Sequence, residues 1–361
     1  MDSLAIAFTG NVFPFGPGHS YGGERELQYL SEGLTDLGHK VYLFAREGTT
    51  VEKVEDYIPV PALTNERDVH FDAVTQYSKE HGIEFDVYQC NYFGEGWSRE
   101  TQNRWPYCEL VWNRWQHSWF QLKEPGSNVI TYSKRLQGAF HEIGLDTTMI
   151  HYGLPKDLYQ CVSEKEDYAV WIGKIEAGKA PHLAIELAKA AGMKIVLMGP
   201  PYNSSHFWQL VAPYIDNETV FWLRGVDDEM KAEVMSKAKV FISSNDNSWQ
   251  EDFGIVNVES LAMGTPVLAF NRINQDCAVV TDKIIEHGKH GFVLNYRDSN
   301  NIDEIIETGV PLINRIHTIN PADCREQFEK RFTANLMARR YEWFFNQIKD
   351  GSRFESLEVP F

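Results

Sequence analysis

Two glutamates, Glu251 and Glu259, stand eight positions apart in the segment EDFGIVNVESLAMGTPVLAF. Gly254 lies between them and favours a helix that begins there, with Glu251 in the preceding loop and Glu259 within the helix. The first amide groups of such a helix, at 254–256, lack partners inside the helix and carry the positive end of its dipole. The segment therefore predicts an anion-binding helix start flanked by two carboxylates.

This segment resembles the E-x7-E signature of the family 4 retaining glycosyltransferases. The likeness includes the Phe-Gly pair after the first glutamate and the run Gly-Thr-Pro-Val at 264–267 after the second. It implies that Glu251 contacts hydroxyls of the donor sugar and that Glu259 hydrogen-bonds the nucleotide ribose. It also places three neighbouring residues at the donor: Phe253, Gly254 and Ile255. The plainer interpretation, two solvated glutamates on an ordinary helix, suits either residue alone better than the whole pattern.

A second match lies earlier in the chain, where Gly173-Lys174 is followed by Lys179. It resembles the Gly-Arg and Lys of the same family, whose cations neutralise the diphosphate of the donor. Lys174 stands where the family usually has arginine, so it keeps the charge but loses the planar, two-pronged donor. Taken alone, these lysines would be surface charges, but their spacing and place in the chain favour a phosphate role.

Two features of the first half extend the resemblance. The pair Gly22-Gly23 resembles the family's glycines between the first strand and the first helix, which let that loop pass close to the diphosphate and the sugar. His117, in VWNRWQHSWF, matches the histidine that faces the donor sugar and the reaction centre. Each also has a plainer interpretation, because loop glycines usually form turns and a histidine among tryptophans is often packed in a core.

Five tryptophans crowd into the same part of the chain: Trp97, Trp105, Trp112, Trp115 and Trp119. Sugars stack on aromatic faces, so this cluster could form a platform for the acceptor. Aromatic side chains also bury large apolar areas, and burial in a core or an interface is the interpretation that we favour.

One departure from the family pattern follows the Pro-Val pair. The family usually has Gly-Gly and then Glu at the start of the next helix, whereas this chain has NRINQDCAVV at 271–280. This keeps open a second interpretation, a non-catalytic protein of the same fold that binds nucleotide sugars or glycans. A sugar-nucleotide epimerase is disfavoured by the E-x7-E segment, and a nicotinamide-dependent dehydrogenase by the lack of a G-x-G-x-x-G run in the sequence.

Short apolar runs alternate with amphipathic helical patterns in both halves of the chain, which predicts βαβ units and parallel sheets with helices on both faces. We predict strands at 4–8, 41–44, 168–172, 194–198, 240–243 and 266–270. We predict helices at 24–37, 182–191, 229–238 and 256–263, and a further amphipathic helical pattern at 331–349. Asp227-Asp228 reads as the cap of one of these helices.

The composition changes around 152–165, where HYGLPKDLYQ gives way to the charged SEKEDY, as expected at a domain hinge. We therefore predict an α/β protein with a Rossmann-like acceptor-side domain at 1–155 and a Rossmann-like donor-binding domain at 156–335. A C-terminal helix at 336–361 would pack back on the first domain. Parallel sheets facing a central cleft would place ligands at the carboxyl ends of their strands. This architecture is the GT-B fold that the resemblance implies.

The chain of 361 residues carries 51 acidic and 34 basic side chains, a formal net charge of -17. This charge disfavours nucleic acid and anionic membrane surfaces as partners. Five widely spaced cysteines lack zinc-ligand spacing and indicate free thiols in a reducing, cytoplasmic compartment. The start MDSLAIAFTG lacks a signal-peptide pattern, and its apolar run is too short to span a membrane.

Through the resemblance, these patterns predict a glycosyltransferase that moves a hexose-type sugar from a UDP- or GDP-sugar, with retention of anomeric configuration. The acceptor would be a glycan, a lipid-linked molecule or a small molecule. Glu251, His117 and Lys179 are the expected catalytic residues. We expect no cofactor besides the donor substrate and no metal, because the sequence offers no DxD-like pair with supporting ligands and the lysines would stabilise the leaving diphosphate. The oligomeric state is left open.

Overall fold

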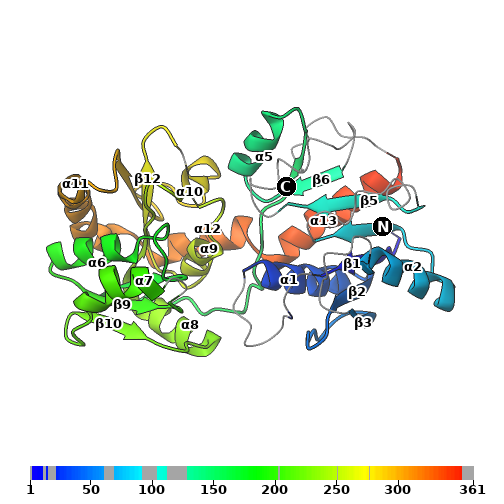
Figure 1. Ribbon diagram of the computed structural model, residues 1–361, viewed down its shortest axis with the longest axis horizontal. Coiled ribbons are helices and arrows are strands. Elements are labelled where there is room, and N and C mark those ends of the chain that lie inside the picture. The colour runs from blue at the N-terminus through cyan, green and yellow to red at the C-terminus, as the bar shows by residue number, and fades with distance from the viewer. Residues whose placement is uncertain are drawn as a thin grey trace. The chain divides into compact units, whose positions relative to one another are not determined.

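The computed structural model describes residues 2–10, 14, 22–60, 69–91, 104–111, 128–201, 204–249, 251–275 and 277–351 (Figure 1). The chain folds into two compact units. Unit 1 comprises residues 1–155 and 332–361, and unit 2 comprises residues 156–331. The chain thus crosses between the units after residue 155 and again after residue 331, whereas the sequence analysis places the second crossing after residue 335.

The sheet of unit 1 is parallel and, in the described part of the chain, has seven strands in the order β3-β2-β1-β4-β5-β6-β7. They are β1 (Ala5–Thr9), β2 (Lys40–Arg46), β3 (Asp56–Val60), β4 (Val87–Cys90), β5 (Tyr107–Leu110), β6 (Asn128–Thr131) and β7 (Thr148–Met149). The described helices of unit 1 include α1 (Gly22–Asp36), α2 (Val69–His81), α5 (Lys134–His141) and α13 (Ala334–Lys349). Strands β4 and β5 are buried at every position, as a parallel sheet covered on both faces requires.

Unit 2 has a second parallel sheet, whose six described strands follow the order β10-β9-β8-β11-β12-β13. They are β8 (Glu166–Ile172), β9 (Lys194–Met198), β10 (Val220–Leu223), β11 (Ala238–Ser243), β12 (Val267–Arg272) and β13 (Gly291–Tyr296). Its α-helices are α6 (Pro181–Ala190), α7 (Ser204–His206), α8 (Asp228–Lys237), α9 (Ile255–Ala262), α10 (Ala278–Thr281), α11 (Ile302–Asn314) and α12 (Pro321–Arg331). Shorter turns are the π-helix Phe207–Val211 and the 3-10 helices Ala212–Tyr214 and Ile316–Thr318.

In each unit the strand order reverses beside the first strand. Strand β4 lies next to β1 on the side opposite β2, and β11 lies next to β8 on the side opposite β9. Ligands of open α/β sheets bind outside the carboxyl ends of the strands at such a reversal. The end of β8 at Ile172 and the end of β11 at Ser243 therefore mark the place in unit 2 where a ligand is expected.

The C-terminal helix α13 packs beside α1 in unit 1, so the predicted return of the chain to the first domain is confirmed (Figure 1). Gly33 on α1 permits a close approach, because a Cβ at this position would lie 3.0 Å from Ala338 Cβ. On the sheet side, the ring centroids of Phe345 and Phe8 are 6.1 Å apart. Both phenylalanines are fully buried, so this helix completes the core of unit 1.

The helical pattern predicted at 331–349 is confirmed from Ala334 to Lys349, but its first three positions differ, because α12 ends at Arg331 and α13 begins at Ala334. Phe332 O accepts a hydrogen bond from Leu154 N at 2.9 Å, which ties this stretch to the chain before the first crossing. Thr333 then caps α13 through its side chain. A tertiary contact therefore interrupts a pattern that is helical on both sides.

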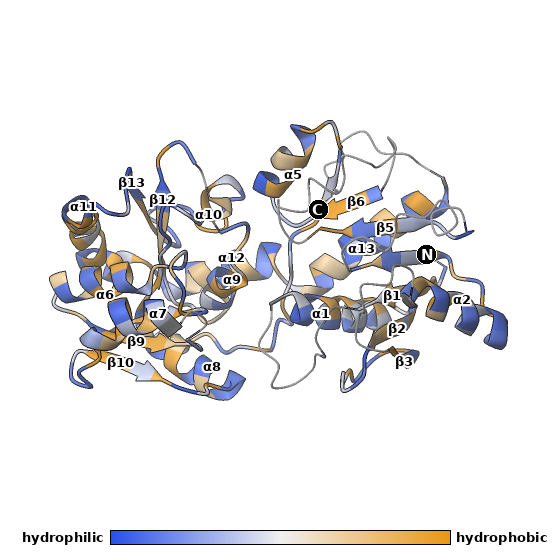
Figure 2. Cartoon of the chain, in the orientation of Figure 1, coloured by the Kyte–Doolittle hydropathy of each residue, from blue (hydrophilic) through white to orange (hydrophobic). Residues whose placement is uncertain are grey.

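The other predicted helices and strands are all present, with ends within two residues of the prediction. The sequence pattern does not predict α2 or β3 to β7 in unit 1, nor β10, β13, α7, α10, α11 and α12 in unit 2. Figure 2 shows that strand β9, which is predicted, is largely hydrophobic. Trp105 is 2% exposed and packs edge-on against Phe71 and Phe85, so for this residue the core interpretation is confirmed. The other tryptophans of the cluster lie outside the described residues: Trp97, Trp112, Trp115 and Trp119.

A buried carboxyl group lies where α1 packs on α13. Glu26 is fully buried, and its Oε1 accepts a hydrogen bond from Tyr341 OH at 3.3 Å. Its Oε2 has no hydrogen-bond partner among the residues that the structure describes. Burial raises the pKa of Glu26 from 4.5 to about 8, against a smaller lowering by the Tyr341 hydroxyl.

Glu26→Gln should therefore stabilise the chain near neutral pH. The folded chain keeps a proton on Glu26 that the unfolded chain releases, so the contribution of this residue to stability is complete below pH 4.5 and is lost as the pH rises toward 8. The stability advantage of the variant should grow by about 1.4 kcal/mol for each pH unit between about pH 6 and pH 7.5. Urea unfolding followed by circular dichroism measures it, with the exposed Glu47→Gln as control. An advantage that stays constant with pH would contradict the raised pKa.

Candidate active site

Lys174 and Lys179 lie in the loop that follows β8, at the carboxyl edge where the strand order of unit 2 reverses. Two glycines allow the loops after β8 and β9 to pass closely. A Cβ on Gly199, whose φ is 137°, would lie 1.9 Å from Gly173 O, so only glycine fits there. Lys174 is the next residue after this contact and is exposed, as a role in binding a soluble anion requires.

The backbone at Lys179 is fixed by a residue that follows β11. Ser244 Oγ lies 2.9 Å from both Lys179 O and Ala180 O, and it accepts a hydrogen bond from Trp171 Nε1 at 3.0 Å. Ala180 is fully buried and left-handed, with φ 44°, which is uncommon for a residue other than glycine. Such strain persists only where the surroundings over-determine it. Here it ends the loop at a defined point and starts α6 at Pro181.

Lys179 and Glu251 form an ion pair, although 72 positions separate them. Their side chains are 23% and 25% exposed, so both can reach solvent. Lys179 Nζ also lies 5.0 Å from the centre of the Trp249 ring, a cation–π contact. Gly178 makes room for this indole, because a Cβ there would lie 2.7 Å from Trp249 Cβ. Two of the predicted catalytic residues therefore meet, beside a tryptophan that sequence reasoning misses.

Glu251 precedes α9 and Glu259 lies inside it, as the sequence predicts. Gly254 occupies the cap position in the left-handed region, with φ 72° and ψ 75°. A Cβ on Gly254 would lie 2.3 Å from Asn257 Nδ2 and 2.7 Å from Glu251 Cγ. Backbone conformation and space thus both require glycine, and a larger residue would displace Glu251.

The start of α9 supplies the amide groups expected at an anion site. Ile255 is the first helical residue and is half-buried. Phe253 is 2% exposed, so its side chain belongs to the core of unit 2 and only its main chain can border a ligand. First-turn amides have no acceptor inside the helix and carry partial positive charge. This end of α9 therefore adds to the positive potential of the two lysines.

Glu259 is 2% exposed, so it is not a solvated surface residue. Its Oε1 accepts hydrogen bonds from Lys231 Nζ at 2.6 Å and from Tyr159 OH at 2.8 Å. Lys231 lies on α8, and Tyr159 lies in the segment that enters unit 2 from the first crossing. The interpretation of two solvated glutamates does not fit, because Glu251 is ion-paired and Glu259 is buried. No local pattern in the sequence points to Lys231 or Tyr159.

Two histidines lie close to the loop that carries Lys179. His182 belongs to the first turn of α6 and His206 ends α7, and their ring centroids are 5.4 Å apart. Burial lowers the pKa of both, that of His182 to about 4, with the neighbouring His206 as a smaller cause. Both rings are therefore neutral at pH 7. The cationic charge of this loop comes from its lysines.

Three predicted site residues belong to the first half of the chain. Gly22 and Gly23 are the first two residues of α1, which corrects the predicted helix start at residue 24. Both belong to unit 1. A glycine pair at a helix start exposes the first amides to a ligand as readily as a loop does. His117 lies outside the described residues.

The segment that replaces the family's Gly-Gly turn also reaches the site. Strand β12 ends at Arg272, and Asn274 takes a left-handed conformation with φ 66°, which asparagine tolerates better than most residues. Ala278 N, at the start of α10, donates a hydrogen bond to Glu251 O at 3.2 Å. The substituted loop therefore still turns, and it holds the main chain of Glu251.

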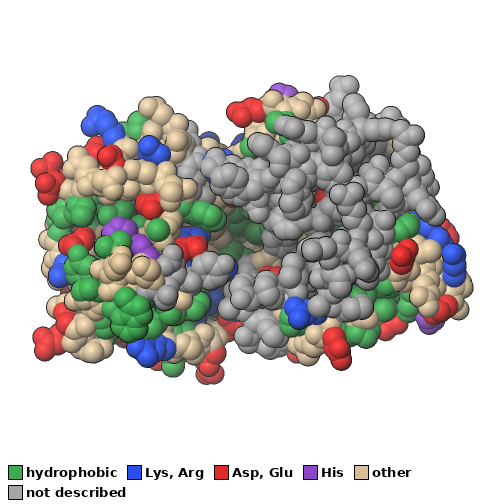
Figure 3. Space-filling model, in the orientation of Figure 1, with side chains coloured by type: hydrophobic (Ala, Val, Ile, Leu, Met, Phe, Trp, Pro, Cys, Tyr) green, Lys and Arg blue, Asp and Glu red, His purple; other side chains and the backbone are tan. Residues whose placement is uncertain are grey.

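In the part of the chain that the structure describes, no group of three or more His, Cys, Asp or Glu side chains is placed to hold a metal ion. None of the described helices is both long enough and apolar enough to cross a membrane. Figure 3 shows acidic and basic side chains mixed over the viewed face of unit 2.

Comparison with known proteins also points to the part of the chain that holds the candidate site. Residues 160–309 match the family model described as glycosyl transferases group 1. Among proteins with curated descriptions, none matches the sequence. AviGT4, a glycosyltransferase involved in avilamycin A biosynthesis, has a similar structure, with a TM-score of 0.70 and 17% identity over 98% of this chain and 100% of that chain.

Two further structures are similar over nearly the whole chain. Sucrose-phosphate synthase from Thermosynechococcus elongatus has a TM-score of 0.75 and 17% identity over 97% of this chain and 100% of that chain. Anabaena HepE, solved in complex with UDP-glucose, has a TM-score of 0.69 and 16% identity over 95% of this chain and 100% of that chain. The chain therefore has the GT-B fold of glycosyltransferases, and the segment that holds Lys179, Glu251 and Glu259 matches the group 1 glycosyl transferases.

Proposed function

We propose that this chain is a retaining glycosyltransferase that moves a hexose-type sugar from a UDP- or GDP-sugar to an acceptor. The observation that carries the proposal is the Lys179–Glu251 pair beside the glycine-started helix α9, at the strand-order reversal of unit 2. The match of residues 160–309 to group 1 glycosyl transferases supports it. The similar structure of HepE holds UDP-glucose, which makes a nucleotide sugar a reasonable donor class.

In this proposal Lys174, Lys179 and the first amides of α9 bind the diphosphate. As the bond to the sugar breaks, negative charge grows on the leaving phosphate, and fixed cations and amides stabilise that charge without reorganising. Lys179 suits this task because its backbone is held by Ser244 and its side chain lies against Trp249. This electrostatic role needs no metal.

Glu251 is then the residue that contacts hydroxyls of the transferred sugar, next to the phosphate that Lys179 binds. Its main chain is held from two sides, by the turn at Gly254 and by the amide of Ala278. The resemblance gives His117 a place at the sugar and Gly22-Gly23 a place near the diphosphate. The acceptor, a glycan, a lipid-linked molecule or a small molecule, would attack on the face that the diphosphate leaves, which retains the anomeric configuration.

The compartment that we propose is the cytoplasm. The five cysteines are all free thiols, and four of them are buried. Free thiols persist in a reducing compartment, where nucleotide sugars would be available to the site. This part of the proposal rests on cysteine chemistry alone.

A second candidate function is nucleotide-sugar binding without catalysis. The altered segment at 271–280, next to Glu251, is the feature that favours it. A thermal-shift screen with UDP-, GDP- and ADP-sugars, followed by assay of nucleotide release, separates the two. A ligand that binds only the folded chain raises its melting temperature in both cases. Release of the nucleotide with any acceptor or with water supports the enzyme.

Lys179→Ala should abolish most activity. Loss of a cation that stabilises the leaving group typically lowers the rate about 10²- to 10³-fold, so kcat/KM for donor turnover should fall by this factor. Lys179→Arg should retain more activity, because it keeps the charge. The control is Lys237→Ala, which removes the same charge from a surface pair with Glu233. Equal activity of Lys179→Ala and Lys237→Ala would show that Lys179 does not stabilise the leaving diphosphate.

Glu251→Gln should separate catalysis from nucleotide binding. The variant keeps the shape of the side chain but loses the charge that Lys179 now pairs with, so the lysine becomes more available to phosphate. We expect UDP or GDP affinity by calorimetry to be unchanged or higher, while donor turnover falls about 10²-fold. A variant with the turnover of the wild type would show that Glu251 has no part in the chemistry.

A further inference from the structure

The carboxylate of Glu259 is held from two directions inside unit 2. Lys231 approaches from α8 and Tyr159 from the entering segment, and both donate to the same oxygen, Oε1, at 2.6 and 2.8 Å. An ionised carboxylate has two oxygens and about four acceptor positions. The two donors therefore fix the position of this oxygen and restrict the orientation of the carboxylate.

The two donors, Lys231 and Tyr159, also contact each other. Lys231 Nζ lies 5.4 Å from the centre of the Tyr159 ring and 3.6 Å from Asp228, so the ammonium has an aromatic face and a second carboxylate beside it. The Lys231 side chain is 13% exposed, and Tyr159 is 3% exposed. Desolvation of this kind makes charged hydrogen bonds strong, and it makes an unpaired charge costly.

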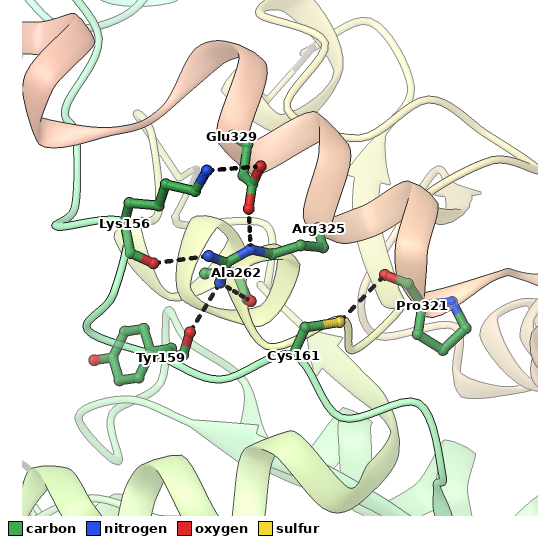
Figure 4. Close-up of polar contacts among 7 residues, drawn as sticks. All are labelled: Lys156, Tyr159, Cys161, Ala262, Pro321, Arg325 and Glu329. Carbon is green, nitrogen blue, oxygen red and sulfur yellow. Dashed lines mark hydrogen bonds and ion pairs between the residues drawn. The ribbon is translucent and has the colours of Figure 1, made fainter.

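Arg325 of α12 fixes the main chain on both sides of this arrangement (Figure 4). Its Nη1 donates to Tyr159 O at 2.8 Å and to Ala262 O at 2.9 Å, and Ala262 is the last residue of the helix that carries Glu259. Its Nη2 donates to Lys156 O at 2.8 Å, and its Nε pairs with Glu329. One guanidinium thus sets the position of Tyr159 relative to α9.

We propose that Lys231 and Tyr159 are positioning residues that hold Glu259 in the orientation that reads the ribose hydroxyls of the nucleotide, and that they thereby set a preference for ribonucleotides. The inference rests on the proposed function and on the ribose contact that the resemblance implies for Glu259. It adds the residues that determine this specificity. Without them the carboxylate could rotate, and the bonds to the sugar hydroxyls would lose their geometry.

The test compares the affinities of UDP and 2′,3′-dideoxy-UDP, and of GDP and 2′,3′-dideoxy-GDP, by calorimetry. Charge-assisted hydrogen bonds to the ribose predict that the wild type binds the ribonucleotide about 10- to 100-fold more tightly than its dideoxy form. Glu259→Gln should lose most of this ratio. Lys231→Met and Tyr159→Phe should lower it as well, the first more than the second, while affinity for the dideoxy nucleotide stays that of the wild type.

Lys237→Met is the matched control, because Lys237 lies on the same helix α8 and pairs with Glu233 instead. Its ratio should equal that of the wild type. Lys231→Met leaves a buried carboxylate unpaired and could unfold. If Lys231→Met does unfold, Tyr159→Phe, which keeps the ring, tests the inference alone.

The outcomes separate the inference from the proposed function. Wild-type discrimination that survives in both Lys231→Met and Tyr159→Phe overturns the inference, and leaves nucleotide binding intact. Equal loss of affinity for the ribo and dideoxy forms would reveal a purely structural role and also overturns it. A wild type that binds none of the four nucleotides removes the proposed function and the inference together.

Discussion

The reversal of strand order between β8 and β11 is the constraint on which the candidate site of unit 2 depends. At this point the connections from neighbouring strands leave the sheet in opposite directions, so their loops diverge and main-chain groups are left accessible. Two sets of contacts organise the loops at this reversal. Glycines at 173 and 199 bring two loops together, and Ser244, just after β11, holds the carbonyl groups at Lys179 and Ala180.

The candidate site contains cations although the chain as a whole is acidic. The whole chain has a net charge of -17, yet cations and helix-start amides meet at the carboxyl edge of this sheet. Both glutamates of the predicted donor site pair with a cation, Glu251 with Lys179 and Glu259 with Lys231. The two pairs differ in burial. A partly exposed pair can exchange partners with a ligand at little cost, whereas a buried pair keeps its geometry because breaking it is expensive. This difference fits the two roles proposed for them, a contact with the reacting sugar and a rigid contact with the ribose.

The sequence predicts the residues that local pattern determines. Glu251, Gly254 and Glu259 lie in one continuous segment whose helix start is dictated by glycine, and the apolar runs of β8, β9, β11 and β12 stand out from their surroundings. It does not predict Tyr159 or Arg325, because their partners are 100 and 166 positions away and either residue could equally be a surface group. Strands β4 and β5 are missed because each is only four residues long and contains a buried polar residue, Gln89 or Glu109, that interrupts the apolar run. The break at Phe332 is missed because a contact with Leu154 causes it.

The loop after β12 bears on whether the unusual sequence at 271–280 argues against catalysis. In the family pattern glycines make the turn, and glycine serves there because it reaches left-handed conformations without strain. Asparagine is the residue that comes nearest to glycine in this respect, and Asn274 has φ 66°. The substituted segment therefore makes a left-handed turn without glycine. The segment leads into α10, whose first amide donates a hydrogen bond to the carbonyl of Glu251. The substituted segment thus fixes the main chain of Glu251, the residue proposed to contact the sugar, so the departure weighs less against an enzyme than the sequence alone indicates.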